Sequence, residues 1–367
     1  MSSTEICAIL REQILKHYPE ATVISLPVAD GGEGTVDCFL QATPGTKEII
    51  TVKNPLFEDM QSFYGLIDEG RTAIIEMAAS AGLPLIEDRK DPVNATTFGV
   101  GQLIIAAANR GVEKIIIGLG GSATNDGGCG AACAVGVRFY DSAGKSFMPT
   151  GGTLRDISRI DISGRDKALD GVEIIAMCDI DNPMYGPSGA AYVFGPQKGA
   201  TPEIVGQLDK GLHHLSDCIK QYIGEDYSQT PGAGAAGAMG AGMMAFFGAK
   251  LQMGIESVLD TLRFDDILTD TDLVITGEGK IDEQSLRGKV VIGVARRAKR
   301  KSVPVIALVG AIGDGIEAAY DEGVSAIFCI NRNAEDFVEA HSRAKSNLAL
   351  AADNLMRFLK YTFSEKH

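Results

Sequence analysis

The C-terminal part of the chain alternates between short apolar runs and amphipathic helical stretches, and this alternation constrains the fold more than any other feature. The runs TDLVITGEG, VPVIALVG and VSAIFCI are typical of strands, and the segments between them have helical periodicity. Apolar strands that alternate with amphipathic helices indicate a parallel sheet covered by helices on both faces. At the other end of the chain, a helix over residues 4–17 and a short strand, ATVISLPVA, are expected to join the same domain.

The middle of the chain follows a different pattern. KEIITVKNP, SFYGLIDEG and RTAIIEMAA have the composition of strands separated by turns, and a helix, TTFGVGQLIIAAANRG, follows them. Further on, GVRFYDSAGKSFMP is typical of a hairpin. We therefore predict an α/β protein with two domains: residues 1–47 plus 269–367 form a doubly wound parallel sheet, and residues 48–268 form a second α/β domain inserted into it.

Composition restricts the partners and the location of the protein. The 367 residues include 34 basic and 48 acidic side chains, which gives a formal net charge of −14. This charge repels nucleic acid and acidic membrane surfaces, so we expect neither as a partner. The seven cysteines are scattered without a CxxC pair, and the N-terminus has no signal-peptide pattern, so we expect a cytoplasmic protein. The sequence leaves the oligomeric state open, a homodimer included.

A glycine-rich loop stands between an apparent strand and an apparent helix in IIIGLGGSATNDGGCGAACAVG, residues 115–136. Such loops often bind phosphate through backbone N–H groups. The first half satisfies the dinucleotide pattern GxGxx(G/A), with Asp141 further on, and this keeps an NAD-dependent oxidoreductase as an alternative. The loop continues through residues 124–128 before any helix begins, and Asp141 lies in the predicted hairpin. Both features favour another kind of phosphate site.

Acidic side chains follow three predicted strands, each time beside glycine. They are Asp30 and Glu33 in VADGGEGT, Asp179 and Asp181 in AMCDIDNP, and Glu278 and Asp282 in ITGEGKID. Carboxylates at strand ends beside glycine-rich loops suit Mg²⁺ and a general base, which phosphoryl transfer requires. A single such residue is more often a turn former, but three clusters together indicate a site.

Basic candidates are few. Lys198 lies between two glycines in FGPQKGAT, where it could meet a phosphate or a carboxylate, and a solvated lysine is the alternative. Arg287 and Lys289 follow the Glu278 cluster and are similar candidates. Walker A, protein-kinase and serine-hydrolase motifs are absent from the sequence, so a nucleotide would need another phosphate-binding loop.

Seven blocks in one order resemble the bacterial type-1 glycerate kinase family: PVADGGEGTVD, IEMAASAGL, GLGGSATNDGG, CDIDNP, FGPQKGAT, PGAGAAGAMGAG and LVITGEGKIDEQSLRGK. The similarity spans nearly the whole chain. It implies ATP-dependent phosphorylation of glycerate, commonly at the 2-hydroxyl group, with Mg²⁺. It also implies two α/β domains, one of them flavodoxin-like and assembled from both chain ends, with the active site in the cleft between them.

The resemblance gives the candidate residues provisional roles. Residues expected to hold ATP are Gly120, Gly121, Ser122, Thr124, Asn125 and Glu278. Asp179 and Asp126 are candidates for the Mg²⁺ ligand or the base, with Asp181 as a further metal ligand. Residues expected to face glycerate or the transferring phosphoryl group are Asp30, Glu33, Lys198 and Arg287.

The beginning of the chain departs from the family pattern. Family members usually start with a strand and an Asp-Ser-Phe-Lys segment, and neither precedes the helix near Ser3. In a flavodoxin-like strand order of 2-1-3-4-5 this strand would be central, so we expect exposed neighbours and a natural start upstream of Met1. The rival interpretation is a truncated, catalytically impaired protein that binds a nucleotide or a sugar acid.

Overall fold

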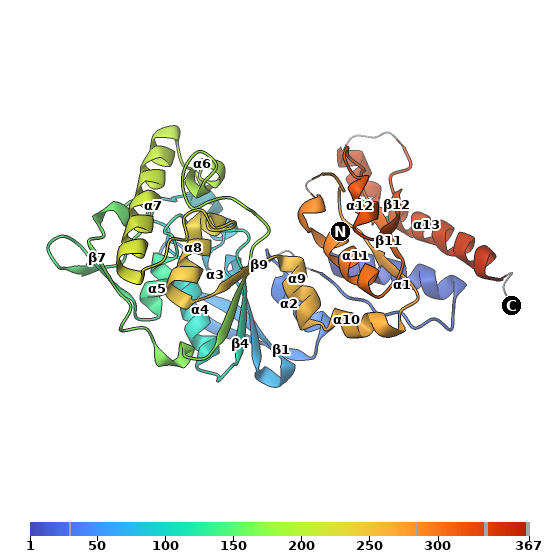
Figure 1. The fold of residues 1–367 in the computed structure, drawn as a ribbon, viewed down its shortest axis with the longest axis horizontal. Coiled ribbons are helices and arrows are strands. Elements are labelled where there is room, and N and C mark those ends of the chain that lie inside the picture. The colour runs from blue at the N-terminus through green and yellow to red at the C-terminus, as the bar shows by residue number, and fades with distance from the viewer. Residues whose placement is uncertain (29–30, 284, 334–336, 365–367) are drawn as a thin grey trace. The chain divides into compact units, whose positions relative to one another are not determined.

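The computed structural model describes residues 1–28, 31–283, 285–333 and 337–364, and within these ranges the side chains of residues 287, 337, 338 and 362–364 are not described (Figure 1). The chain divides into two compact units, Met1–Ala29 with Val258–His367, and Asp30–Ser257. Both units combine parallel strands with helices, which confirms the α/β class. The domain boundaries predicted from the sequence, after residues 47 and 268, lie C-terminal to the boundaries of these units. They remain a prediction.

The unit of residues 30–257 is built on a six-stranded sheet in the order β1-β2-β3-β4-β8-β9. The strands are β1 (Gly45–Lys53), β2 (Asp59–Ile67), β3 (Thr72–Glu76), β4 (Lys114–Gly118), β8 (Glu173–Met177) and β9 (Lys250–Gln252). β1, β2 and β3 are antiparallel neighbours, whereas β3, β4, β8 and β9 run parallel. Register aligns Glu76 with Gly118 and Gly118 with Met177, so the carboxyl ends of three parallel strands are level.

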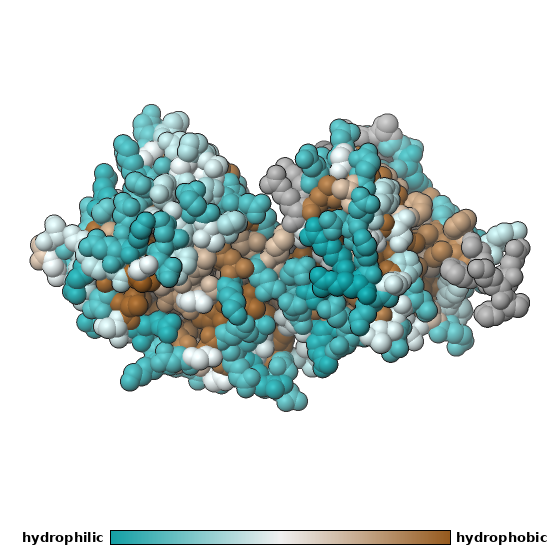
Figure 2. Space-filling model, in the orientation of Figure 1, coloured by the Kyte–Doolittle hydropathy of each residue, from teal (hydrophilic) through white to brown (hydrophobic). Residues whose placement is uncertain are grey.

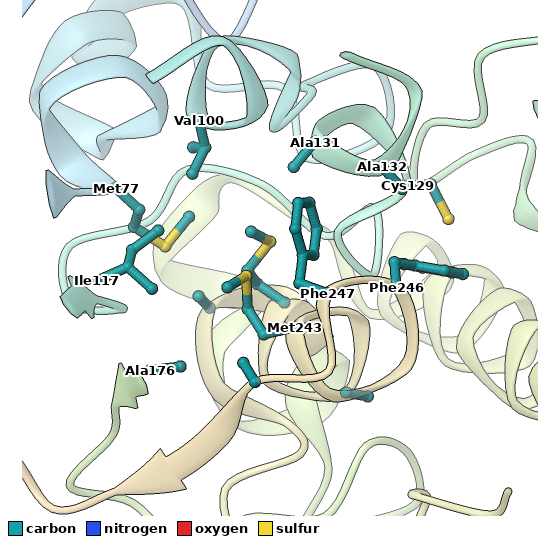
Figure 3. Close-up of a cluster of buried hydrophobic side chains, with 14 of the residues drawn as sticks. Met77, Val100, Ile117, Cys129, Ala131, Ala132, Ala176, Met243, Phe246 and Phe247 are labelled. Carbon is teal, nitrogen blue, oxygen red and sulfur yellow. The ribbon is translucent and has the colours of Figure 1, made fainter. Parts of the chain in front are cut away.

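Small side chains allow the helices of this unit to pack closely on the sheet. The helices are α2 (Thr35–Ala42), α3 (Ala78–Ala81), α4 (Phe98–Ala108), α5 (Cys129–Ala134), α6 (Ala190–Phe194), α7 (Pro202–Ile223) and α8 (Ala235–Phe247). Figure 3 shows side chains of α4, α5 and α8 packed with those of β4 and β8 and with Met77, which directly follows β3. A Cβ atom on Gly101 of α4 would collide with the backbone of Ala131 in α5, so this helix crossing requires glycine.

A small antiparallel sheet, β6-β5-β7, lies outside the main sheet. Its strands are β5 (Arg138–Tyr140), β6 (Ser146–Phe147) and β7 (Arg159–Asp161). The β5–β6 pair is the hairpin expected from GVRFYDSAGKSFMP. Asp141 stands in its turn, where Oδ1 accepts hydrogen bonds from the amides of Ala143 and Lys145, at 2.9 Å each. Asp141 is therefore a turn residue of this hairpin.

The other unit contains a three-stranded parallel sheet in the order β10-β11-β12. Its elements are α1 (Ser3–His17), α9 (Gly254–Thr261, shared with the first unit), α10 (Phe264–Ile267), β10 (Val274–Thr276), α11 (Val290–Arg300), β11 (Val305–Val309), α12 (Ala318–Asp321), β12 (Val324–Cys329) and α13 (Phe337–Ser364). Ile306 and Leu308 of β11 join a core cluster with Leu10 of α1 and Leu355 of α13. Since side chains alternate along a strand, the intervening residues of β11 face the side covered by α11.

Helix α11 is amphipathic, as its sequence suggested. Val291, Ile292 and Ala295 are fully buried, whereas Lys299 and Arg300 are exposed. The strongly hydrophilic surface over α11 in Figure 2 agrees with this division. The helix thus covers one face of the small parallel sheet while its charged face remains in water.

The prediction of a strand over ATVISLPVA, residues 21–29, was wrong. Residues 21–28 form no strand, and Ile24 is 57% exposed. A strand is defined by its ladder to a neighbour, and within the described residues β10 pairs with β11 alone. The segment is instead held against α1, where Arg11 Nη1 donates to the Val23 carbonyl oxygen at 2.7 Å.

The uncharged run PGAGAAGAMGAGMMAFFG forms the loop before α8 and α8 itself. Phe246 and Phe247 at its end are buried in the core of the unit. Across the described ranges, we find no helix whose length and hydropathy would let it span a bilayer.

Candidate functional site

Two glycine-rich loops meet at the level carboxyl ends of β3, β4 and β8. The amide of Gly120 donates to the carbonyl oxygen of Gly31 at 3.0 Å, and the amide of Leu119 donates to that of Met177 at 3.2 Å. A Cβ atom on Gly118 would collide with the backbone of Gly31, which itself has a φ of 86°. In open α/β sheets, ligands bind at the carboxyl ends of the strands. The loops of residues 31–34 and 119–128 therefore form the candidate site.

The 119–128 loop is accessible in its first part, around Gly121, and buried in its second. Gly121 is exposed and Gly120 is half-buried, whereas Ser122 is only 8% exposed and Thr124 and Asn125 are completely buried. Among the described residues, the amides of Gly121 and Ser122 donate to no backbone acceptor. A phosphate group could reach this first part, but the side chains of Thr124 and Asn125 lie beneath it.

Lys198 connects the two parts of this loop from the protein interior. It ends the short 3-10 helix Pro196–Lys198, and its side chain is 1% exposed. Nζ donates to Ser122 Oγ at 2.8 Å and to the Thr124 carbonyl oxygen at 2.7 Å. Burial lowers the pKa of Lys198 to about 7, although Asp126 acts in the opposite direction. The alternative of a solvated lysine does not apply.

Asp126 fixes the buried end of the loop. Its Oδ2 accepts hydrogen bonds from Thr97 N at 2.8 Å, Thr97 Oγ1 at 2.9 Å and Gly130 N at 3.2 Å, and its Oδ1 accepts one from Gly128 N at 3.1 Å. Burial raises the pKa of this carboxyl group, and the four donors act in the opposite direction. With its oxygens occupied, Asp126 is better suited to positioning than to binding a metal ion or removing a proton.

Asn125 stands out because its polar atoms lack partners. Among the described residues neither Oδ1 nor Nδ2 makes a hydrogen bond, and Thr124 Oγ1 is likewise unpaired. Next to them, residues 236–238 adopt left-handed φ values of 56°, 68° and 67°. Unpaired buried polar groups cost about 1–3 kcal/mol each, and left-handed alanines cost a similar amount. Such costs concentrate at functional sites.

Asp179 and Asp181 follow β8 at the same edge of the sheet. Asp179 is half-buried, and its Oδ1 accepts a hydrogen bond from the Gly254 amide at 2.7 Å, whereas Asp181 is exposed. The described part of the chain contains no group of three His, Cys, Asp or Glu side chains that could hold a metal ion. Two carboxylates suit Mg²⁺ that takes its other ligands from phosphate and water.

The remaining sequence-based candidates are distributed over both units. Glu33 is exposed in the 31–34 loop, directly before α2, and Asp30 lies outside the described residues. Glu278 follows β10 in the other unit, where burial raises its pKa and Oε1 is buried without a hydrogen-bond partner within the described ranges. The side chain of Arg287 is not described.

Sequence reasoning missed two residues that hold the loops. Thr97 precedes α4 and donates to Asp126, and its signal was the Thr-Thr pair before an apolar helix, which is typical of a helix start. Glu76 ends β3, is 3% exposed and accepts the Val36 amide at 2.6 Å. Nothing in the local sequence of Glu76 indicates that distant partner.

Comparison with known proteins places the whole chain in one family. Residues 1–360 match the model described as the glycerate kinase family. A glycerate kinase of Bacillus cereus is 44% identical over 100% of this chain and 96% of its own. The glycerate 2-kinase of Escherichia coli is 42% identical over 97% of this chain and 93% of its own. The crystal structure assigned to glycerate kinase 2 of Salmonella typhimurium matches with a TM-score of 0.87 and 42% identity, covering 99% of this chain and 95% of that one.

The resemblance read from the seven sequence blocks is thus confirmed over the full length. The match includes the loops at the carboxyl ends of β3, β4 and β8 as well as the C-terminal sheet. The chain belongs to the glycerate kinase family.

Proposed function

We propose that the protein catalyses the ATP-dependent phosphorylation of glycerate, at the 2-hydroxyl group, in the cytoplasm. Family membership and relatives named glycerate kinase and glycerate 2-kinase support the reaction. The structural observation that carries it is the 119–128 loop, which the buried Lys198 ties at Ser122 and Thr124. A glycine-rich loop held by a buried lysine is suited to phosphate when, among the described residues, the amides of Gly121 and Ser122 have no backbone acceptor.

The protein's contribution to phosphoryl transfer is mainly positioning and charge neutralisation. Gly121 and Ser122 offer their backbone amides, and Ser122 its hydroxyl group, to the phosphates of ATP, whereas the Gly120 amide is bonded to Gly31 and shapes the loop. Thr124 and Asn125 support this part from the interior. Glu33, in the adjoining loop, accepts a hydrogen bond from a hydroxyl group of glycerate. The roles of Asp30, Arg287 and Glu278 stay as proposed from the sequence.

Asp179 and Asp181 would hold Mg²⁺ together with the phosphate oxygens. Bound there, the ion would neutralise charge on the transferring group. Asp179 is the better placed candidate for this role, because its Gly254 hydrogen bond fixes one carboxylate oxygen after β8. Asp126, enclosed by its four donors, positions the loop.

The reaction is tested by ADP release with D-glycerate, Mg²⁺ and ATP. We expect ADP to form in step with an organic phosphate that enolase dehydrates directly, because enolase acts on 2-phosphoglycerate. A product that requires a mutase first would contradict the 2-hydroxyl assignment. Nucleotide binding without glycerate-dependent ADP would contradict the kinase, and reduction of NAD by the substrate would support an oxidoreductase instead.

Replacing Lys198 by Met should loosen the phosphate loop. The change removes two hydrogen bonds of a buried cation, so we expect kcat/KM for ATP to fall about 100-fold. Lys210→Met, an exposed lysine of α7, is the matched control and should leave kcat/KM within about twofold. A Lys198→Met enzyme that is folded and fully active would exclude this tether from the mechanism.

The same variant should change how stability depends on pH. Lys198 has a pKa of about 7 in the folded protein and about 10 in an unfolded chain, so between these values the unfolded chain binds more protons. The free energy of unfolding of the wild type should therefore rise relative to that of Lys198→Met from about pH 7 to pH 10. Chemical denaturation across this interval measures the difference, and parallel curves would contradict a buried lysine.

Replacing Asp179 by Asn should impair use of Mg²⁺. The amide oxygen can still accept the Gly254 hydrogen bond, but the negative charge is lost, so we expect the Mg²⁺ concentration for half-maximal activity to rise about 10- to 100-fold. Asp141→Asn in the β5–β6 turn is the control and should behave as the wild type. Normal turnover and an unchanged Mg²⁺ requirement in Asp179→Asn would refute the assignment.

A further inference from the structure

Glu76 is a buried carboxylate at the edge of the candidate site to which neither the sequence nor the proposed mechanism gives a role. It is the last residue of β3, is 3% exposed, and lies level with Gly118 at the end of β4. Burying an ionisable group is unfavourable unless it is hydrogen-bonded. The partners of Glu76 therefore indicate what it does.

Those partners lie at the start of α2. Oε1 accepts a hydrogen bond from the Val36 amide at 2.6 Å, and the amide of Gly34, directly before the helix, also lowers the pKa of this carboxylate. Gly34 is the N-cap of α2, has a φ of 84° and has no side chain with which to cap the helix. Glu76 thus supplies from β3 the cap that a Ser, Thr or Asp at position 34 would supply locally.

This cap determines where the 31–34 loop lies. From Gly34 the chain passes back through Glu33 to Gly32, whose carbonyl oxygen accepts Thr35 Oγ1 at 2.7 Å. It then reaches Gly31, which is held by the Gly120 amide. The loop is fixed at both ends, by Glu76 and by Gly120, and Glu33 is the exposed side chain between them.

We propose that Glu76 is a positioning residue that fixes the 31–34 loop and thereby directs Glu33 toward glycerate. This rests on the proposed function, in which Glu33 meets the substrate. Because the carboxylate of Glu76 bonds to the Val36 amide and places a negative charge at the start of α2, this helix start is poorly suited to bind an anion. The 31–34 loop then recognises glycerate through the side chain of Glu33, while the phosphates bind to the neighbouring 119–128 loop.

The charges around Glu76 are compatible with this role. Burial raises the pKa of Glu76, the two backbone amides oppose that shift, and Asp37 and Lys47 act with smaller and opposite effects. Asp37 and Lys47 also form an ion pair at 2.6 Å, which limits their net influence. The hydrogen bonds to backbone amides are therefore the interaction that is specific to Glu76. The variants should distinguish the effect of these hydrogen bonds from the effect of the negative charge of Glu76.

The test compares Glu76→Leu, Glu76→Gln and Glu76→Asp with the wild type. Leu removes both acceptors at similar size, so we expect the KM for glycerate to rise about tenfold. Gln keeps an acceptor oxygen at the same distance and should restore most of the affinity. The KM for ATP and kcat should change less than about threefold, since the 119–128 loop keeps its own supports. Glu113→Leu, an exposed residue before β4, is the control.

A double-mutant cycle with Glu33→Ala, which removes the acceptor, tests whether Glu76 acts through Glu33. We expect the effect of Glu76→Leu on the KM for glycerate to shrink strongly in the Glu33→Ala background. Equal effects in both backgrounds, or a folded Glu76→Leu enzyme with an unchanged KM, would overturn the proposal. If Glu76→Leu does not fold, Glu76→Asp takes its place, because its shorter side chain withdraws the carboxylate from the two amides.

Amide hydrogen exchange separates failure of this proposal from failure of the proposed function. The amides of Gly34 and Val36 should exchange faster in the Glu76 variants than in the wild type, whatever reaction the protein catalyses. Unchanged exchange would overturn the cap itself. A wild type without glycerate-dependent ADP release would overturn the proposed function and, with it, the link to Glu33.

Discussion

The close approach of Gly31 to Gly118 and Gly120 is the constraint on which the candidate site depends. A Cβ atom on Gly118 would collide with the backbone of Gly31, so the two loops can touch only because this position lacks a side chain. The Gly120–Gly31 hydrogen bond then joins two segments that are far apart in the sequence. Level strand ends at Glu76, Gly118 and Met177 provide the platform on which this contact forms.

Three buried ionisable side chains hold the two loops and the helices that adjoin them. Lys198 ties Ser122 to Thr124, Asp126 ties the loop to the start of α4 and α5, and Glu76 caps α2. Each bonds to backbone amides or carbonyls, so their charges serve loop geometry. This arrangement suits phosphoryl transfer, where placing the reacting groups and offering donors to phosphate oxygens accounts for most of the catalysis.

Sequence patterns predicted what depends on local periodicity and turn chemistry. The parallel strands β10, β11 and β12, the β5–β6 hairpin and the glycine loop after β4 all stand where strand composition and glycine placed them. The features that could not be predicted depend on contacts between residues that are distant in the sequence. Residues 21–28 have the composition of a strand but form no strand in the structure. Glu76 accepts its hydrogen bond from Val36 on another element, α2. Asp126 looked like a catalytic carboxylate because sequence reports its charge but not the four donors that enclose it.

The role proposed for the 119–128 loop, binding the phosphates of ATP, can be seen in a crystal structure with Mg²⁺, a non-hydrolysable ATP analogue and glycerate. We expect phosphate oxygens within hydrogen-bond distance of the Gly121 and Ser122 amides, with Lys198 still bonded to Ser122 and Thr124. Phosphates bound elsewhere, for example at residues 232–237 before and within α8, with the 119–128 loop unoccupied, would contradict it.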